Sequence, residues 1–452
     1  MLCTTEFLQG IFPEQKGKDS VANPIHGIMT DSRKNQQDTL FIPIIGERFD
    51  AHQYIDQAIR NGAIAALWDK THNIPEDYPD DFVFFLVDDT VSALQTFASA
   101  YCEHVNPLVI GITGSNGKTT TKDLLKSVLQ NKFRTHATKG NFNNEIGLPL
   151  TILQMEAQTE VLILEMGMSD FGEIELLSRL AKPQYAIITN IGESHIEHLG
   201  SRAGIAQAKL EIANGLQTNG LLIIDGDEPL LDDWTQRTNV ISCGISDTND
   251  VQISHILLKQ DTTQFTFDAN ERYVVPLLGE HHAKNASFVI TLAKKLGMNA
   301  EDIQAGLMRL EHSAMRFERL IGKENATLIN DAYNASPTSM KGAINVVKSM
   351  ESFHTKVLVL GDVLELGSFS ESLHESVAEV IGPPIDVVYT YGEMAAIISE
   401  RVTNQNPAIE VEHFTKKRDL VNALERKANE DTVMLFKASR GMAFEKLIEA
   451  LR

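Results

Sequence analysis

A glycine-punctuated stretch at residues 109–122, VIGITGSNGKTTTK, most constrains what this chain can fold into. The apolar run that enters it predicts a β-strand, and the spacing of apolar residues at 123–129 predicts an α-helix. Glycines let successive backbone N–H groups of such a loop point at one anion, and the start of the helix adds partial positive charge. Strand, loop and helix in this order therefore predict a polyphosphate site.

Two residues of this loop have expected tasks. Lys118 is expected to reach the β- and γ-phosphates of a nucleotide, and Thr119 to ligate Mg²⁺. The spacing G-x-x-G-x-x-G-K-T departs from the usual G-x-x-x-x-G-K-[ST], because five residues separate Gly111 from Gly117. A glycine-rich turn that binds nothing is the alternative, and the Gly-Lys-Thr followed by a helix argues against it.

Length and charge exclude several classes of protein. The 452 residues predict about three domains of roughly 150 residues each. With 40 basic and 61 acidic residues, the net charge of −21 opposes nucleic acid and anionic membranes as partners. Three scattered cysteines lack metal or redox spacing, and no signal peptide or long apolar span is visible. We expect a cytoplasmic, monomeric enzyme of small molecules, without membrane insertion.

The chain divides into three expected α/β units. Residues 1–105 form a small unit, in which apolar runs at 40–45, 63–67 and 82–87 alternate with a helical pattern at 54–60. Residues 106–312 form the P-loop unit, whose apolar runs at 161–164, 186–188 and 221–224 predict a parallel sheet covered on both faces. Residues 313–452 repeat the pattern, with strands near 326–329, 357–360, 387–389 and 433–436, as a Rossmann-like unit without its own phosphate loop. This third unit is expected to close over ATP.

Polar residues follow two strands of the central unit, where parallel sheets bind ligands. Glu165 ends one strand and is expected to ligate Mg²⁺ or to support a ligand, a paired structural acid being the alternative. His195 follows another strand, and a lone histidine is more often structural than metal-binding.

Lys209 lies in a segment, 201–216, that the spacing predicts to be helical. The residues three and four positions away are apolar: Ile205, Ala206, Ile212 and Ala213. Its side chain could extend to solvent. Alternatively, burial lowers its pKa, and the neutral amine takes up CO₂ as a carbamate, an anion that can ligate Mg²⁺.

Taken together, these segments resemble the Mur ligase family of ATP-dependent amide-bond-forming enzymes over essentially the whole chain. The resemblance rests on GSNGKTT at 114–120, TKGNFNNEIGLPL at 138–150, EMGM at 165–168, His195 with LGS at 199–201, AKLEI at 208–212 and NDAYNASP at 330–337. Three positions depart from the family pattern and put local contacts in doubt: Ala51, His282 and Met315.

The resemblance implies a role for each matching residue. ATP would bind at Gly114, Ser115, Asn116, Gly117, Lys118, Thr119, Thr120, Asn285, Arg316 and Asp331. Mg²⁺ would lie near Thr119, Glu165, His195 and a carbamylated Lys209. The catalytic residues would be Lys118, Glu165, His195 and Lys209. A UDP-MurNAc-peptide would contact Ser32, Arg33, Asn141, Asn143 and Asn144.

The implied reaction joins D-Ala-D-Ala to UDP-MurNAc-tripeptide through an acyl phosphate, which gives a pentapeptide precursor of peptidoglycan. A family member that adds the third peptide residue is the nearest alternative, but the chain has Asp331-Ala-Tyr-Asn where Asp-Asn-Pro-Arg is typical of many such enzymes. Folylpolyglutamate synthase normally starts near its P-loop, whereas about 105 residues precede it here. A P-loop switch without an acyl acceptor is the alternative from another class. The third peptide residue, lysine or diaminopimelate, and the base for the incoming amine stay open.

Overall fold

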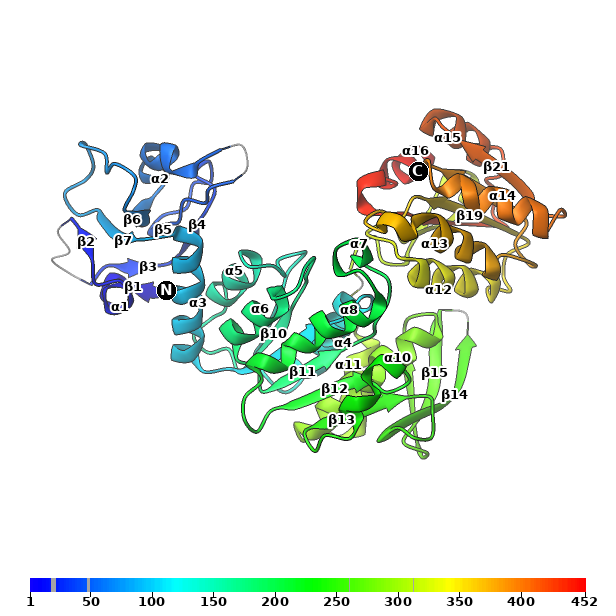
Figure 1. The fold of residues 1–452 in the computed structure, drawn as a ribbon, viewed down its shortest axis with the longest axis horizontal. Helices are drawn as coiled ribbons and strands as arrows, with labels where there is room; N and C mark the ends of the chain where they lie inside the picture. Colours follow the sequence, from blue (N-terminus) through cyan, green and yellow to red (C-terminus); the bar gives the residue numbers. More distant parts are fainter. Residues whose placement is uncertain (18–21, 47–48, 260, 312) are drawn as a thin grey trace.

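The computed structural model describes residues 1–17, 22–46, 49–259, 261–311 and 313–452. Its three main β-sheets follow one another along an elongated molecule, from the N-terminal domain to the C-terminal domain (Figure 1). This three-part α/β architecture is the one that the sequence predicts. The expected boundary at 312 lies outside the described residues. No helix within the described ranges is both long and apolar enough to cross a membrane.

The N-terminal domain is a five-stranded sheet in the order β2 (Gln15–Lys16), β7 (Val83–Val87), β6 (Ala63–Asp69), β5 (Thr39–Phe41), β4 (Gly27–Met29). The short strands β1 (Cys3–Thr4) and β3 (Pro24–Ile25) pair beside it, and its helices are α1 (Thr5–Ile11), α2 (Ile55–Arg60) and α3 (Thr90–Val105). The strand expected at 40–45 ends at Phe41. Pro43 has no N–H to continue the ladder, and its carbonyl instead accepts the Thr90 hydroxyl at 2.6 Å.

The central sheet begins at its outer edge with β9 (Thr135–Ala137), β10 (Val161–Glu165), β8 (Leu108–Thr113) and β11 (Tyr185–Ile188). It continues through β12 (Leu221–Asp225), β13 (Val240–Gly244) and β14 (Val251–Lys259), and all these neighbours pair in parallel as predicted. An antiparallel extension, β15 (Thr262–Phe267) and β16 (Glu271–Val275), was not predicted. Its strands alternate buried and partly exposed residues, so they lack the continuous apolar runs of the parallel strands.

Helices cover both faces of the central sheet, because alternate side chains of each strand point to opposite faces. One face packs against α5 (Gly147–Leu153), α6 (Glu173–Ala181) and α8 (Arg202–Leu210). The other packs against α4 (Lys118–Leu129), α10 (Glu280–Lys295) and α11 (Ala300–Met308). This arrangement leaves the carboxyl ends of β8, β10 and β11 at one edge, where the loops that carry the predicted site begin.

The α-helix predicted over 201–216 is shorter than expected. It ends at Leu210 and continues as a 3₁₀ helix, η2 (Glu211–Gly215). The Ser178 hydroxyl donates to the Ile212 carbonyl at 2.5 Å, and a Cβ on Gly215 would lie 2.2 Å from the Ser178 carbonyl carbon. The close approach of α6 therefore tightens this segment. Lys209 still lies in the α-helical part.

The C-terminal sheet has the order β17 (Glu318–Ile321), β18 (Thr327–Asn330), β22 (Thr432–Lys437), β19 (Thr355–Gly361), β20 (Val387–Tyr391), β21 (Glu410–Phe414). Only the pair β17 and β18 is antiparallel among these described strands. Helices α12 (Pro337–Lys348), α13 (Ser370–Val377) and α14 (Ala395–Gln405) cover one face, and α15 (Lys417–Glu425) and α16 (Glu445–Leu451) cover the other. The N-terminus of α12 faces the central domain, since Ser336 and Thr338 bond to residues of that domain.

Candidate active site

The loop between β8 and α4 requires glycine at two positions. Gly114 has φ of +147°, and a Cβ there would lie 1.9 Å from the Thr189 hydroxyl oxygen. Gly117 has φ of +81°, and a Cβ there would lie 2.8 Å from Asn285 Oδ1. Both positions combine a left-handed backbone with close neighbours, so a larger residue would strain the loop or displace those neighbours. The loop geometry thus depends on residue types that the sequence motif specifies.

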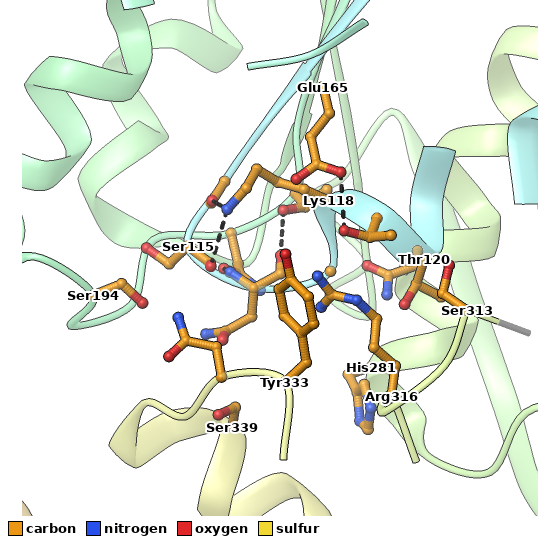
Figure 2. Close-up of a pocket in the computed structure, with 18 of the residues that line it drawn as sticks. Ser115, Lys118, Thr120, Glu165, Ser194, His281, Ser313, Arg316, Tyr333 and Ser339 are labelled. Atoms are coloured by element: carbon orange, nitrogen blue, oxygen red, sulfur yellow. Dashed lines mark hydrogen bonds between the residues drawn. The ribbon is translucent and has the colours of Figure 1, made fainter. Parts of the chain in front are cut away.

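A cavity of about 480 Å³ lies between this loop and the C-terminal domain (Figure 2). All the residues predicted to contact ATP line it: Gly114, Ser115, Asn116, Gly117, Lys118, Thr119, Thr120, Asn285, Arg316 and Asp331. Five other predicted site residues line it as well: Asn143, Asn144, Glu165, His195 and Lys209. The structure therefore brings these residues together, while their individual roles remain predictions.

The side chain of Lys118 folds back onto the phosphate loop. Its Nζ donates to the carbonyl oxygens of Gly114, at 2.6 Å, and Ser115, at 3.3 Å (Figure 2). The surrounding protein removes water and lowers the pKa of Lys118, an effect that the Glu165 carboxylate opposes and Arg316 reinforces. A phosphate group in the cavity would supply the negative charge that this lysine needs.

Glu165, at the end of β10, is 3% exposed and fixed at both oxygens. Oε2 accepts the Thr119 hydroxyl at 2.9 Å, and Oε1 accepts the side-chain N–H of Asn143 at 3.0 Å. These contacts orient the carboxylate beside the phosphate loop. A carboxylate and a hydroxyl are hard oxygen donors of the kind that Mg²⁺ prefers, so this part of the site fits that ion chemically.

His195 takes a left-handed backbone, with φ of +63°, just before α7 (Ile196–Leu199). Its Nδ1 lies 2.5 Å from Glu365 Oε2, which comes from the C-terminal domain. Burial lowers the pKa of His195; Glu365 opposes that shift, while Lys118 and Lys209 add to it. Glu365 has no sequence signal, because it belongs to no recognisable motif and reaches His195 only through the fold.

Lys209 is 2% exposed, which excludes the alternative in which its side chain extends to solvent. Among the described residues, no hydrogen bond or ion pair to its amine is present. Burial lowers the pKa of Lys209 well below its usual range, and the positive charge of Lys118 adds to the shift. The neutral amine that carbamylation requires is therefore favoured by the position.

The C-terminal domain supplies the opposite wall of the cavity. The Arg316 guanidinium stacks on the Tyr333 ring, 4.3 Å from its centroid, and both face the phosphate loop in Figure 2. Asp331 accepts from Lys437 Nζ at 2.6 Å and from the Phe317 backbone N–H at 3.1 Å. Lys437 had no predicted role. A lysine that ends an apolar strand is the signal that would have identified it.

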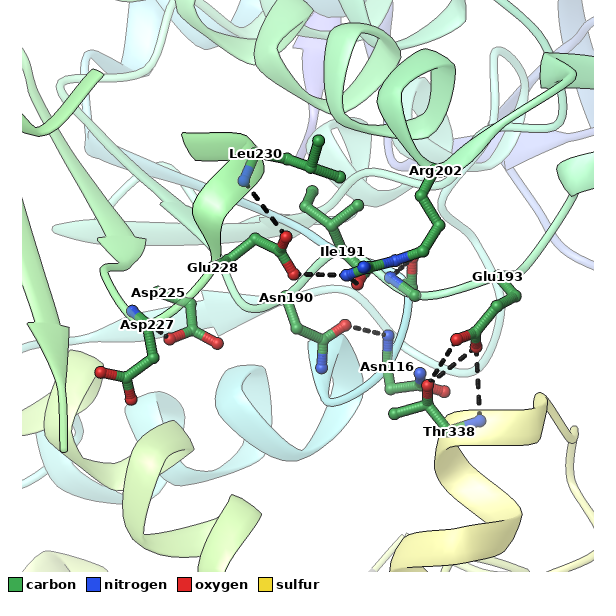
Figure 3. A network of polar contacts seen from close by, with 12 residues as sticks. Asn116, Asn190, Ile191, Glu193, Arg202, Asp225, Asp227, Glu228, Leu230 and Thr338 are labelled. Atoms are coloured by element: carbon green, nitrogen blue, oxygen red, sulfur yellow. Dashed lines mark hydrogen bonds and ion pairs between the residues drawn. The ribbon is translucent and has the colours of Figure 1, made fainter. Parts of the chain in front are cut away.

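Hydrogen bonds join the two domains at the edge of this cavity (Figure 3). The Thr338 hydroxyl, in the first turn of α12, donates to Glu193 Oε1 at 2.8 Å. The Ser336 hydroxyl donates to Asn116 Oδ1 at 3.1 Å, and the Asn116 backbone N–H donates to Asn190 Oδ1 at 2.9 Å. The phosphate loop, the loop after β11 and helix α12 therefore form one connected network.

Three predicted substrate residues lie outside this cavity. Asn141 lines a second, neighbouring cavity of about 500 Å³. Ser32 and Arg33 line neither cavity and lie between β4 and β5 of the N-terminal domain. The Ser32 hydroxyl donates to Gln57 Oε1 at 2.9 Å, and Arg33, whose side chain is 80% exposed, forms an ion pair of 2.8 Å with Asp31. An exposed arginine is available to a ligand on that domain.

Comparison with protein families accounts for most of the chain. The Mur ligase family catalytic domain matches residues 24–102, the Mur ligase middle domain 112–293, and the Mur ligase glutamate ligase domain 315–440. A curated relative from Bacillus subtilis (strain 168) is 47% identical over 447 residues, which are 96% of each chain. The chain belongs to the Mur ligase family. That relative is named UDP-N-acetylmuramoyl-tripeptide--D-alanyl-D-alanine ligase.

Solved Mur ligase structures share the whole architecture. MurF from Acinetobacter baumannii has a TM-score of 0.88 at 29% identity, covering 99% of this chain and 98% of that one. MurF from Thermotoga maritima in complex with ADP has a TM-score of 0.83 at 28% identity, covering 94% of this chain and 96% of that one. The arrangement of three domains is therefore that of Mur ligases over their full length.

The lowered pKa of Lys209 predicts a pH-dependent stability difference. At pH values between the native pKa of Lys209 and its unfolded pKa of about 10.4, Lys209 carries a proton in the unfolded chain but not in the native chain. The stability of the wild type therefore rises with pH in that window relative to Lys209→Met. In CO₂-free buffer without nucleotide, Lys209→Met should unfold at higher urea than wild type at pH 7, and the difference should shrink toward pH 10.

The exposed lysine Lys126, on α4, provides the control for this measurement. Lys126→Met should show a difference from wild type that stays nearly constant over the same pH range. An equally constant difference for Lys209→Met would mean that the native Lys209 amine is protonated as readily as an exposed one.

Proposed function

We propose that this chain is the ligase that adds D-Ala-D-Ala to UDP-MurNAc-tripeptide at the expense of ATP, forming the pentapeptide precursor of peptidoglycan. The observation that carries the proposal is the cavity in which the Lys118 loop, Glu165 and Lys209 of the central domain face Arg316 and Asp331 of the C-terminal domain. The relative of the same name, which is 47% identical over 96% of the chain, supports it.

The proposal gives each domain a task. Residues 1–105 would bind the UDP part of the substrate, residues 106–312 would bind ATP, and residues 313–452 would close on ATP and present the incoming amine. ATP phosphates would lie on residues 114–120, with Asn285, Arg316 and Asp331 near the rest of the nucleotide. Asn141, Asn143 and Asn144 would contact the muramoyl-peptide. The substrates are small and the net charge is −21, so we expect a cytoplasmic monomer with no nucleic-acid partner.

Mg²⁺ would be held by Thr119, Glu165, His195 and the carbamylated Lys209. The hydroxyl and carboxylate oxygens fit this ion, and a carbamate would add a further oxygen. When bound, Mg²⁺ supplies positive charge that neutralises the transferring phosphoryl group. The ADP complex of the Thermotoga maritima relative supports a nucleotide in this cavity.

The chemistry follows from positioning and charge. The terminal carboxylate of the tripeptide attacks the γ-phosphate of ATP, ADP leaves, and the product is an acyl phosphate. The neutral amine of D-Ala-D-Ala then attacks the acyl carbon and forms the C–N bond, the nitrogen gives up a proton to a base, the C–O bond to phosphate breaks, and phosphate leaves with the bonding electrons. Lys118 would stabilise the charge that develops on the phosphoryl oxygens, and Arg316 would add positive charge from the other domain. Closure of the two domains would keep water from the acyl phosphate.

The alternatives have weaker support. The relatives that align over nearly the whole chain carry the D-Ala-D-Ala ligase name, and this disfavours a ligase for the third peptide residue. A nucleotide switch would hydrolyse ATP without an acyl acceptor. Phosphate release that depends on both UDP-MurNAc-tripeptide and D-Ala-D-Ala, with the pentapeptide identified by mass, would distinguish the ligase from both.

Lys118→Ala should lower kcat of the ligation by at least about 10²-fold, the scale expected when one preorganised electrostatic group is removed. The fold should persist, because among the described residues the side chain donates only to two carbonyls of its own loop. Lys126→Ala removes an exposed lysine from the same helix and should retain wild-type activity. Phosphate release measures both, and activity of Lys118→Ala within a few fold of wild type would contradict the phosphate-loop assignment.

Arg33→Ala should raise KM for UDP-MurNAc-tripeptide and leave KM for ATP unchanged, because Arg33 lies on a separate domain from the nucleotide cavity. The loss of one charged hydrogen bond predicts about a 10-fold effect. Lys34→Ala, the exposed neighbour, is the control. Equal losses for both substrates would point to a folding defect instead.

Lys209→Ala should be nearly inactive at ordinary Mg²⁺ concentrations, because a carbamate attracts the ion whereas an ammonium repels it. A short-chain carboxylic acid should restore part of the rate of Lys209→Ala and none of that of Lys118→Ala. A crystal structure of the wild type should show density for three atoms beyond Lys209 Nζ, or the intact native protein should carry an added mass of about 44 Da, that of CO₂, as expected for an amine of lowered pKa. An active Lys209→Ala, together with an unmodified wild-type lysine, would refute the carbamate.

A further inference from the structure

An arginine outside both cavities supports the loop between β11 and α7, residues 189–195. Arg202, in the first turn of α8, donates from Nη2 to the Ile191 carbonyl at 2.8 Å and to Glu228 Oε2 at 2.6 Å (Figure 3). Neither Arg202 nor Glu228 lines a cavity described above. The pair therefore contacts the loop without contacting the space in which a nucleotide would lie.

Arg202 occupies a position that does not favour a cation. The N-terminus of an α-helix carries partial positive charge, so acidic residues stabilise the first turn and basic residues do not. The first turn of α8 has no acidic residue, and Ser201 caps the helix by accepting the Gly204 N–H at 3.0 Å. The charge of Arg202 therefore adds nothing to the stability of the helix. Its contacts outside the helix are the feature that accounts for an arginine here.

Glu228 holds the guanidinium in place. Its side chain is 9% exposed, and its Oε1 accepts the Leu230 N–H at 3.3 Å, at the start of the 3₁₀ helix η3 (Pro229–Leu231). The Nη2 atom of an arginine has two N–H groups, so one can point to the carboxylate while the other points to the Ile191 carbonyl. A carboxylate fixed on one side of the guanidinium thus determines where the carbonyl on the other side lies.

The loop connects Ile191 to the phosphate loop through both of its neighbours. The Asn190 carbonyl accepts the Ser115 N–H at 3.1 Å, and Asn190 Oδ1 accepts the Asn116 N–H at 2.9 Å. On the other side, the Gly192 N–H donates to Ser115 Oγ at 2.8 Å. The position of Ile191 therefore bears directly on the residues that would surround the phosphates.

The two loops are packed too closely to move independently. A Cβ on Gly192 would lie 3.1 Å from Ser115 Cβ, and Ile191 is 4% exposed. Further along the same loop, Glu193 accepts the Thr338 hydroxyl of the C-terminal domain at 2.8 Å. A close-packed interior transmits a displacement instead of absorbing it. A shift of the Ile191 carbonyl should therefore reach both the phosphate loop and the contact with the C-terminal domain.

We propose, resting on the ligase function above, that Arg202 is a positioning residue for phosphoryl transfer. It acts through the Ile191 carbonyl: by fixing this oxygen, it sets the loop 189–195 and, with it, the backbone N–H groups of the phosphate loop. Glu228 orients the guanidinium for this task. The alternative is an ordinary half-exposed ion pair, which contributes little to stability and nothing to the reaction.

Arg202→Met keeps a long side chain and removes both hydrogen bonds. It should lower kcat of the ligation by about 10- to 100-fold, the scale of a small misplacement of reacting groups. It should also raise the Kd of ADP with Mg²⁺, measured by calorimetry, by about 10-fold, the scale of one hydrogen bond. KM for UDP-MurNAc-tripeptide should not change. Arg202→Lys should recover part of both losses, because an ammonium also donates hydrogen bonds.

A second variant separates positioning from stability. Arg202→Met leaves Glu228 as a nearly buried carboxylate without its cation, which destabilises the fold. The double variant Arg202→Met/Glu228→Gln removes that charge, so its urea midpoint should return toward wild type while kcat and the Kd of ADP stay as in Arg202→Met. Glu228→Gln alone keeps an oxygen that can accept from Arg202 and should retain most of the activity. Arg179→Met, which breaks an exposed ion pair with Glu175 on α6, is the matched control and should change neither value.

Each outcome decides the role of Arg202. Recovery of kcat and of ADP affinity in the double variant would mean that the uncompensated carboxylate caused the loss, and this would overturn the proposal. Wild-type values for Arg202→Met, or equal losses of affinity for ADP and UDP-MurNAc-tripeptide, would overturn it as well. A wild type that binds ADP but forms no pentapeptide would overturn the ligase function, whereas the ADP affinities would still decide the effect of Arg202 on the phosphate loop.

Discussion

The site depends on positive charge enclosed by protein. Burial lowers the pKa of Lys118 and of Lys209; the charge of Lys118 adds to the shift at Lys209, whereas at Lys118 Glu165 opposes the shift and Arg316 adds to it. Such an arrangement is unfavourable by itself, because charges removed from water need partners. The surrounding structure holds it in place through the parallel sheet and the helices on both faces. A bound polyphosphate, and a chemical change of Lys209 to an anion, are two ways to balance the charge.

The domains divide the chemistry between them. The central domain carries the rigid part of the cavity on strand ends, where Glu165 and the glycine loop have little freedom. The C-terminal domain supplies a wall, with Arg316 on Tyr333 and Asp331 held by Lys437. The N-terminal domain packs on the central domain through α3 and presents an exposed arginine. Catalysis in this arrangement requires that three domains hold one long substrate together with ATP.

Much of the central site could be predicted because its residues are adjacent in sequence and follow local rules. The strand, glycine loop and helix at 108–129 are a single motif, and the strands of continuous apolar residues mark their own carboxyl ends. Glu365 could not be predicted, since it meets His195 only when two domains come together across 170 residues of chain. The change from α-helix to 3₁₀ helix at Glu211 depends on the close approach of α6, and the β15–β16 extension depends on one-sided burial. Lys209 is intermediate: spacing predicted its apolar face, but only the fold established how completely it is enclosed.

The hydrogen bonds from helix α12 to Asn116 and Glu193 have a kinetic consequence. Ser336 contacts the phosphate loop itself, so the C-terminal domain lies over the place where a nucleotide must enter and leave. Release of a spent nucleotide therefore requires these bonds to break and the domain to move away. Motions of this kind occur in microseconds to milliseconds and often set the turnover rate of an enzyme. In such a cycle the order in which substrates bind would follow from which of them the closed domain covers.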